Sequence, residues 1–212
     1  MSASDLATAI VSTAGRMNAL GINRGTSGNV SARTGEGFLI TPSGMAYDSM
    51  QPEDIVRVTS AGEATGPRAP STEWRFHRDI YAARADVGAI VHTHSTFCTT
   101  LACVGRSIPA FHYMVALAGG NDIRCAPYAT FGTQALADAA LAALANRRAC
   151  LLANHGMIAT AASLEAALSL AVEVEALAEQ YWRALQIGAP RILDDAEMAI
   201  VAEKLSGYGP ST

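Results

Sequence analysis

The feature that most constrains the fold is the regular alternation of helical and extended patterns along the chain. Apolar residues recur every three or four positions from Leu6 to Met17, which predicts a first helix up to about Leu20. The short apolar stretches FLIT and IVRV predict strands. Because helices and strands interleave without a repeat or an obvious linker, we expect the 212 residues to form one layered α/β domain.

The remaining elements follow from the same patterns. A helix is expected over about residues 73–84, with Ser71 or Thr72 as its N-cap and Glu73 in its first turn, where a carboxylate suits the helix dipole. The other predicted segments are a strand at IVHTHS, a helix at FCTTLACVG, a helix at TQALADAALAALANRR, an extended stretch at ACLLANHGMIAT, a long helix over about residues 164–187 and a last helix that starts near Asp194 and Asp195.

Composition narrows the class of protein. Half of the residues are apolar and only 16% are charged, which is typical of a globular domain. The net charge of −4 argues against a general nucleic-acid binder, which needs a basic surface. We find neither signal-peptide features nor a stretch of about 20 uninterrupted apolar residues, so we expect a cytoplasmic protein without a membrane partner. The four cysteines are expected to be buried free thiols.

A pair of histidines stands out in the strand-like stretch IVHTHS. Side chains alternate faces along a strand, so His92 and His94 are expected to project from the same face. Two buried imidazoles need partners, and a catalytic zinc site commonly takes three protein ligands. His155 in LLANHG is the best third ligand by context, and His77 is its competitor. A structural role in hydrogen bonding is the alternative for each of them.

Other residues fit the chemistry of such a site. Glu73 could serve as a metal ligand or general base if its helix start faces the histidines; otherwise it is an ordinary surface acid. The stretches GTSGN, TPSG and PST each offer backbone and hydroxyl donors that suit a phosphate. Each by itself is typical of a plain turn, and none matches a Walker A or dinucleotide pattern. Their number in one short chain favours a phosphorylated ligand.

Seven segments in order carry a resemblance to a known family: GTSGNVS, ITPSGM, STEWRFHRDIY, IVHTHSTFCTTLA, IPAFHYM, APYATFGT and LLANHGMIA. The chain resembles the class II aldolase/adducin family over nearly its whole length, and within it the aldolases that act on L-fuculose 1-phosphate. The resemblance implies a single domain over residues 1–212. It further implies a three-layer α/β/α sandwich with a central mixed, largely antiparallel sheet, and a homotetramer with active sites between subunits.

The resemblance also implies roles for individual residues. It assigns one zinc ion per subunit, or Mn²⁺ or Co²⁺ in its place, to His92, His94, His155 and Glu73, with Glu73 also the catalytic acid/base. The matching phosphate-binding residues are Gly28, Asn29, Ser43, Gly44, Ser71 and Thr72.

Aromatic residues complete this assignment. Tyr113 and Tyr208 correspond to catalytic tyrosines contributed across the subunit interface, and Phe131 to a wall of the aldehyde pocket. The tail from about residue 206 is expected to cover the active site. Tyr113 could equally be a packing aromatic, and Phe131 is expected to be buried in any case. His77 and His112 are assigned no metal role.

The implied activity is the reversible cleavage of a ketose 1-phosphate to dihydroxyacetone phosphate and an aldehyde. The substrate would be L-fuculose 1-phosphate or a related deoxypentulose or methylthioribulose 1-phosphate. Two alternatives lie within the family: a sugar-phosphate 4-epimerase and a methylthioribulose-1-phosphate dehydratase. The epimerase branch typically carries an aspartate in place of Glu73. A non-catalytic adducin-like interaction module ranks low, because that branch lacks the histidines present here.

Overall fold

The computed structural model describes residues 2–206, which form a nine-stranded sheet in the order β4-β3-β2-β1-β5-β9-β8-β7-β6. The β7 and β8 strands pair in parallel, and the other neighbours in this sheet pair antiparallel. The strands are β1 (Asn29–Thr34), β2 (Gly37–Ile40), β3 (Val56–Thr59), β4 (Ala64–Thr65), β5 (Ala89–Thr93), β6 (Ile108–Pro109), β7 (Asp122–Ala126), β8 (Ala149–Leu152) and β9 (Gly156–Ala161).

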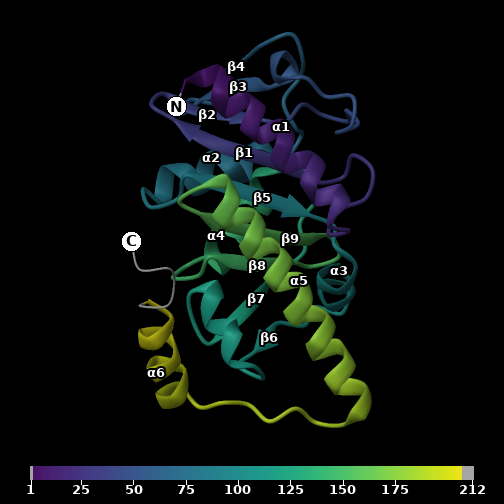
Figure 1. Cartoon of the computed structure of the whole chain (residues 1–212), viewed down its shortest axis with the longest axis vertical. Helices are drawn as coiled ribbons and strands as arrows, with labels where there is room; N and C mark the ends of the chain where they lie inside the picture. Colours follow the sequence, from purple (N-terminus) through teal and green to yellow (C-terminus); the bar gives the residue numbers. More distant parts are fainter. Residues whose placement is uncertain (1, 207–212) are drawn as a thin grey trace.

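Helices cover both faces of the sheet, which makes three layers (Figure 1). The α1, α3 and α5 helices lie on one face, and α2 and α4 pack against each other on the opposite face. The helices are α1 (Ala3–Ala19), α2 (Trp74–Ala83), α3 (Thr96–Cys103), α4 (Gln134–Ala143), α5 (Leu164–Ile187) and α6 (Asp195–Ser206), with short 3-10 helices η1 (Pro52–Asp54) and η2 (Tyr113–Ala118). The expected three-layer fold with a largely antiparallel sheet is confirmed.

Each face of the sheet carries its own apolar core. Strand alternation sends Val91 to the side of α1 and α5, and Ile90 to the side of α2 and α4. His92, two residues after Ile90, faces the α2 side as well, where its ring meets the edge of the Phe76 ring at a centroid distance of 5.5 Å. His92 therefore lies at the end of the apolar core between the sheet and α2.

Several sequence expectations need correction. The α2 helix begins at Trp74, so Glu73 is its N-cap instead of Ser71 or Thr72, and the Glu73 side chain makes no capping hydrogen bond. The stretch ACLLANHGMIAT is a hairpin of β8 and β9, not one extended segment. Of the cysteines, Cys98 and Cys150 are buried, whereas Cys103 is exposed and Cys125 is half-buried; all four are free thiols.

The strand β1 was not anticipated because its sequence, NVSART, is largely polar. The side chains of Asn29, Ser31 and Arg33 lie on one face of the strand. Each forms hydrogen bonds with residues of α2 or of the segment after it. Val30 and Ala32 alternate on the opposite face and enter the apolar core there. A strand whose buried side is hydrogen-bonded instead of apolar gives no alternating hydrophobic pattern.

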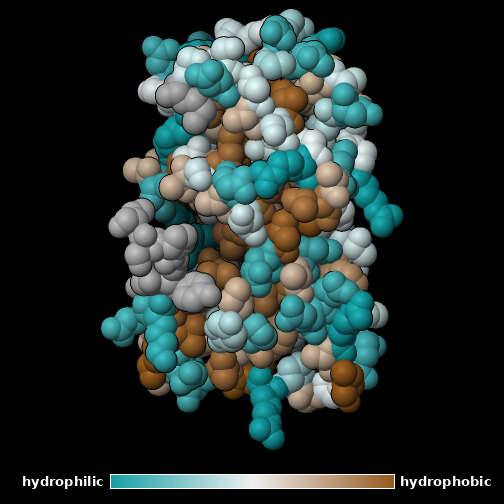
Figure 2. Space-filling view, in the orientation of Figure 1, coloured by the Kyte–Doolittle hydropathy of each residue, from teal (hydrophilic) through white to brown (hydrophobic). Residues whose placement is uncertain are grey.

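Figure 2 shows the face that α1 and α5 cover, with apolar side chains gathered near the middle of the molecule. None of the helices within residues 2–206 has the length and apolar character needed to cross a membrane.

Candidate metal and active site

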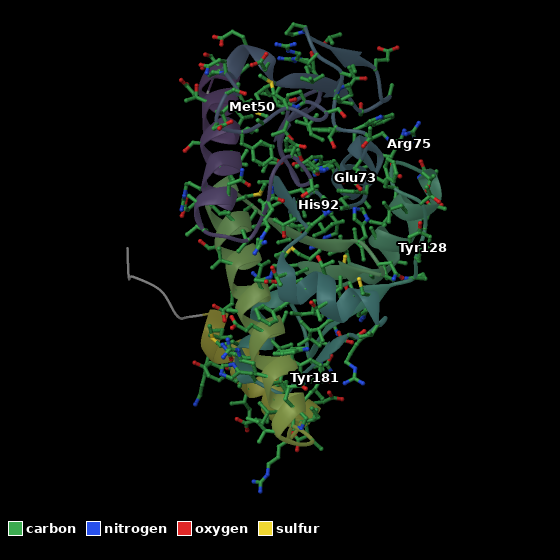
Figure 3. The ribbon with its side chains drawn as sticks, turned by 90° about the vertical axis from the view of Figure 1, so that its right-hand side faces the viewer. Met50, Glu73, Arg75, His92, Tyr128 and Tyr181 are labelled. Carbon is green, nitrogen blue, oxygen red and sulfur yellow. The ribbon has the colours of Figure 1, made fainter. Side chains whose placement is uncertain are left out.

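Four side chains converge at one point, from the start of α2, the end of β5 and the β8–β9 turn. The candidate ligand atoms of Glu73, His92, His94 and His155 all lie within 4.8 Å of one another. The Nε2 atoms of His92 and His155 are each 3.1 Å from a different carboxylate oxygen of Glu73. The Nε2 atoms of His92 and His94 are also 3.1 Å apart. Figure 3 shows Glu73 and His92 close together, with Tyr128 farther out.

The histidines present ring nitrogens to this point. His92 Nδ1 lies 2.9 Å from the carbonyl oxygen of Met157, and because a carbonyl only accepts, Nδ1 carries the proton. The other ring nitrogen of His92, Nε2, then faces the other candidate ligands. Burial, followed by the nearby charges of His92 and His155, lowers the pKa of His94 to about 3. His94 is therefore neutral at pH 7, the form that binds a metal.

Glu73 supplies the negative charge of the cluster. Burial by itself raises the pKa of this carboxyl, but the charges of His92 and His155 and the contacts of both rings with its oxygens hold it well below its usual range. Its Oε2 atom accepts a hydrogen bond of 2.9 Å from the side-chain amide of Asn29. Its Oε1 atom is buried and has no well-aligned hydrogen bond, although His155 Nε2 is near.

This donor set fits a divalent metal ion. Bonds of about 2.0–2.1 Å in a tetrahedral site hold ligand atoms roughly 3.3 Å apart, close to the 3.1 Å separations measured here. Ring nitrogens and a carboxylate oxygen that face one another at this distance repel unless a cation or proton lies between them. Three imidazoles and one carboxylate are ligands that suit zinc and related transition metals.

Two glycines let the backbone approach the cluster closely. A Cβ atom on Gly28 would lie 2.6 Å from the carbonyl oxygen of His92, and one on Gly156 would lie 2.3 Å from that of Thr93. The left-handed residue of the β8–β9 turn is Asn154, with φ of 55°. Glycine is required at position 156 because β9 passes too close to β5 there to leave room for a side chain.

A cavity of about 320 Å³ opens directly onto the cluster. It is lined by Thr26, Ser27, Thr72, Glu73, His94, Tyr128, Ala129, Phe131, Asn154 and His155. A larger cavity of about 690 Å³ lies between η2 and α6, far along the sheet from this cluster, and contains none of the four ligand residues. The smaller cavity is the one that chemistry at the cluster can use.

The expected phosphate-binding residues surround this cavity to different degrees. Thr72 lines it, and the Ser71 hydroxyl accepts a hydrogen bond of 3.3 Å from the backbone N–H of Glu73. Asn29 contacts Glu73 directly, as described above. The loop of Ser43 and Gly44 is joined to the loop of Ser71 by backbone hydrogen bonds, but neither Ser43 nor Gly44 lines the cavity.

The aromatic residues divide into three cases. Phe131 lines the cavity and is 65% exposed, so the expectation that it is buried in any case is wrong. Tyr113 on η2 is 49% exposed and does not line the cavity of its own chain. It is therefore not a core packing residue. Tyr208 and most of the expected covering tail lie outside the described residues.

Sequence reasoning missed some residues of the cavity wall. Tyr128 precedes Phe131 by three positions in APYATFGT and is 63% exposed, and Asn154 directly precedes His155. The sequence signal that could have identified Tyr128 is an aromatic residue in the turn-like stretch APYATFGT. His77 does not belong to the cluster: its ring bonds to Asn29 and Ser31 instead.

Comparisons with known proteins agree with this geometry. Residues 8–182 match the model of the Class II Aldolase and Adducin N-terminal domain. The chain is 61% identical over 200 residues to the 5-methylthioribulose-1-phosphate/5-deoxyribulose-1-phosphate aldolase of Rhodospirillum rubrum, a match that covers 94% of this chain and 90% of that protein. It is 48% identical to the L-fuculose phosphate aldolase of Escherichia coli, covering 99% of this chain and 98% of that protein.

A solved structure named L-fuculose 1-phosphate aldolase superposes on this chain with a TM-score of 0.94 and 40% identity, covering 97% of this chain and 98% of that one. The match therefore covers nearly the whole chain. By its sequence, its architecture and its cluster of three histidines and a glutamate, the chain belongs to the class II aldolase and adducin family.

Proposed function

We propose that this protein is a metal-dependent lyase that reversibly cleaves a ketose 1-phosphate into dihydroxyacetone phosphate and an aldehyde. The observation that carries the proposal is the convergence of Glu73, His92, His94 and His155 beside a cavity that three of them line. The relatives named as aldolases for methylthioribulose, deoxyribulose and fuculose phosphates support it.

The three histidines and Glu73 would hold one zinc ion, or Mn²⁺ or Co²⁺ in its place. A metal bound there supplies Lewis acidity, which stabilises the negative charge that develops beside the substrate carbonyl by several kcal/mol. No lysine Schiff base is required. Among residues 2–206 the chain has one lysine, Lys204 on α6, and this lysine does not line the cavity.

Glu73 would take and return the proton on the hydroxymethyl carbon of dihydroxyacetone phosphate. Its Oε1 atom suits this role because it is buried, lacks a hydrogen bond and belongs to a carboxylate that borders the cavity. A positioned base of this kind contributes roughly 10²–10⁴-fold to the rate.

Donors of three loops would hold the substrate phosphate. The assigned residues are Gly28, Asn29, Ser43, Gly44, Ser71 and Thr72. Binding a group remote from the reacting carbon orients the rest of the substrate against Glu73. The link between the loops of residues 41–44 and 70–72 supports this, because it joins two donor-rich segments next to Glu73.

The wall opposite the metal ligands would receive the aldehyde. Phe131, Tyr128 and Ala129 give this wall an apolar character. An apolar wall favours the small aldehydes with a methyl or methylthio group that 5-deoxyribulose and 5-methylthioribulose 1-phosphates release. L-Fuculose 1-phosphate, whose aldehyde carries one more hydroxyl, is the third substrate to test; discrimination among the three is expected to be weak, because a pocket rejects one added group poorly.

We further propose a cytoplasmic homotetramer, with each active site completed by a neighbouring subunit. Tyr113 would come from that neighbour and donate a hydrogen bond or a proton to the aldehyde oxygen. Its exposure in the single chain supports this role. Tyr208 and the tail would close over the site. Sedimentation velocity on the purified protein would measure the oligomeric state.

The direct test is a panel of the three ketose 1-phosphates with the zinc-loaded protein, assayed for dihydroxyacetone phosphate. Release of this product, its loss after chelation and its return with added zinc, manganese or cobalt would support the proposal. A changed pentulose phosphate without cleavage would identify an epimerase, and loss of water from methylthioribulose 1-phosphate would identify a dehydratase. If none of the three substrates is converted, the remaining hypothesis is a non-catalytic interaction module.

A further inference from the structure

A buried chain of hydrogen bonds runs along α2 and β1 and ends on Glu73. The Tyr81 hydroxyl lies 2.8 Å from Ser31 Oγ, and Ser31 Oγ lies 2.7 Å from His77 Nδ1. His77 Nε2 lies 2.6 Å from Asn29 Oδ1, and Asn29 Nδ2 lies 2.9 Å from Glu73 Oε2. All five residues are buried, His77 and Ser31 completely.

Regular spacing on the two elements produces this alignment. Glu73, His77 and Tyr81 are four residues apart, so they lie on one face of the α2 region. Asn29 and Ser31 are two residues apart, so they lie on one face of β1. The helix face and the strand face meet, and the polar side chains of the two elements alternate along the chain of hydrogen bonds.

The donor and the acceptor of each hydrogen bond can be assigned by starting from Glu73, the acceptor at the end of the chain. Glu73 is a carboxylate and can only accept, so the amide nitrogen of Asn29 faces it and the amide oxygen faces His77. His77 must then donate from Nε2. Burial lowers the pKa of His77 to about 3, so the ring is neutral and its Nδ1 accepts from Ser31. The network thus selects one tautomer of His77 and one rotamer of Asn29.

The His77 ring is also fixed by packing. It stacks on the Phe76 ring at a centroid distance of 4.5 Å and on the Phe38 ring at 6.3 Å. Asn29 in turn is paired across the sheet with His92, so it has little freedom to follow a displaced partner. A rigid donor therefore meets the Asn29 oxygen from one side, and an anionic acceptor meets its nitrogen from the other.

We propose that His77 is a positioning residue, which holds the Asn29 amide so that its N–H group binds Glu73 Oε2 and leaves Oε1 without a hydrogen bond. This inference rests on the proposed proton transfer by Glu73. Without the His77 donor, the Asn29 oxygen is buried without a partner and the amide is free to rotate, which would turn its oxygen toward the carboxylate. Glu73 would then move away from the position in which one oxygen is bound and the other is free.

Two polar replacements of His77 separate its two nitrogens. In His77→Gln the side-chain amide nitrogen extends about as far as Nε2, and it keeps a donor to Asn29. In His77→Asn the shorter amide stands near Nδ1 and keeps only the contact with Ser31. We expect His77→Asn to lower kcat by about 10–100-fold, as for other residues that orient a metal ligand, with an unchanged KM and one bound metal. His77→Gln should recover most of the loss.

A double-mutant cycle tests whether His77 acts through Asn29. In an Asn29→Ala background, His77→Asn should cause no further loss of kcat, because the group that His77 positions is gone. Additive losses would overturn the proposal. Ile80→Val is the matched control, because Ile80 is buried on the same helix and lies outside the hydrogen-bonded chain. It should lower stability without changing kcat.

A readout independent of activity is the imidazole ¹⁵N spectrum of the folded protein with labelled histidine, with the His77 signals assigned by loss in His77→Gln. A neutral ring protonated at Nε2 at pH 7 is expected. A ring protonated at Nδ1, or one that is charged, would overturn the proposal even if the enzyme is fully active. If the wild-type protein releases no dihydroxyacetone phosphate, the proposed function fails, while this spectrum still decides the orientation of Asn29.

Discussion

At the scale of single residues, Glu73 combines requirements that are rarely met together. It is the N-cap of α2, yet its side chain turns away from the helix and toward His92 and His155. Its own backbone N–H donates to Ser71 Oγ, and its carboxylate makes no capping hydrogen bond to the helix. The result is a buried acid whose ionised form is stabilised by its neighbours and whose Oε1 atom is free of hydrogen bonds.

Glu73→Gln is expected to retain the metal and lose most turnover. The three histidines remain as ligands, whereas the amide that replaces the carboxylate cannot accept a proton from carbon. We expect kcat to fall by roughly 10²–10⁴-fold, with about one metal ion per chain by elemental analysis. Turnover similar to that of the wild-type protein would exclude Glu73 as the base.

His155→Ala is expected to lose the metal, because only His92 and His94 remain as imidazole ligands. His112→Ala is the matched control: His112 accepts a hydrogen bond from the backbone N–H of Met114 and does not belong to the cluster. Elemental analysis after dialysis against metal-free buffer should find metal in the control and little in His155→Ala. The reverse result would show that the third histidine ligand is misassigned.

At the scale of elements, α5 fixes the start of α3, which begins two residues after His94. Glu175 on α5 accepts hydrogen bonds from Ser95 Oγ at 2.7 Å and from the backbone N–H groups of Phe97 at 2.8 Å and Cys98 at 2.9 Å. A carboxylate from another helix thus caps α3 where Ser95, its N-cap, makes no capping bond of its own. This connection holds the chain immediately after His94.

Glu175→Ala is expected to destabilise the fold by about 3 kcal/mol, because two backbone donors and one hydroxyl lose a charged acceptor. Glu179→Ala is the matched control on the same helix, since its ion pair with Arg183 is exposed and worth less than about 1 kcal/mol. Urea unfolding would measure both changes. Equal effects of the two substitutions would contradict the assigned capping role.

At the scale of the whole molecule, buried neutral histidine links folding to pH. Burial, followed by the charge of His92, lowers the pKa of His77 to about 3 from its ordinary 6.5. The unfolded chain therefore binds a proton at this residue below about pH 6.5 that the folded chain does not bind until about pH 3. Stability is lost as the pH falls through this window, by about 1.4 kcal/mol per pH unit for one proton.

The measurement is the unfolding free energy of the metal-free protein at several values between pH 7.5 and pH 4. His77→Gln should show a shallower pH dependence than the wild-type protein over this range, because it lacks the group that protonates on unfolding. Identical slopes would show that His77 is not buried in its neutral form. The difference between the two proteins removes the contributions of the carboxyl groups that both contain.

The sequence by itself determined the layered α/β class, the helices at both ends of the chain and the shared face of His92 and His94. These follow from periodicities of 3.6 and 2, which are local properties of the chain. The same local patterns indicated that His155 ends an apolar strand, and the family resemblance then assigned it to zinc.

The tertiary structure decided what those residues meet. Glu73 reaches the histidines because β1 and β5 pair with Asn29 opposite His92, and because α2 packs over that end of β1. His77, which the sequence offered as a competitor of His155 for the metal, joins Asn29 through the same packing instead. The polar strand β1 shows no hydrophobic alternation, since its buried face is satisfied by hydrogen bonds from α2. Contacts between distant segments set these partners, and no local period of the sequence encodes them.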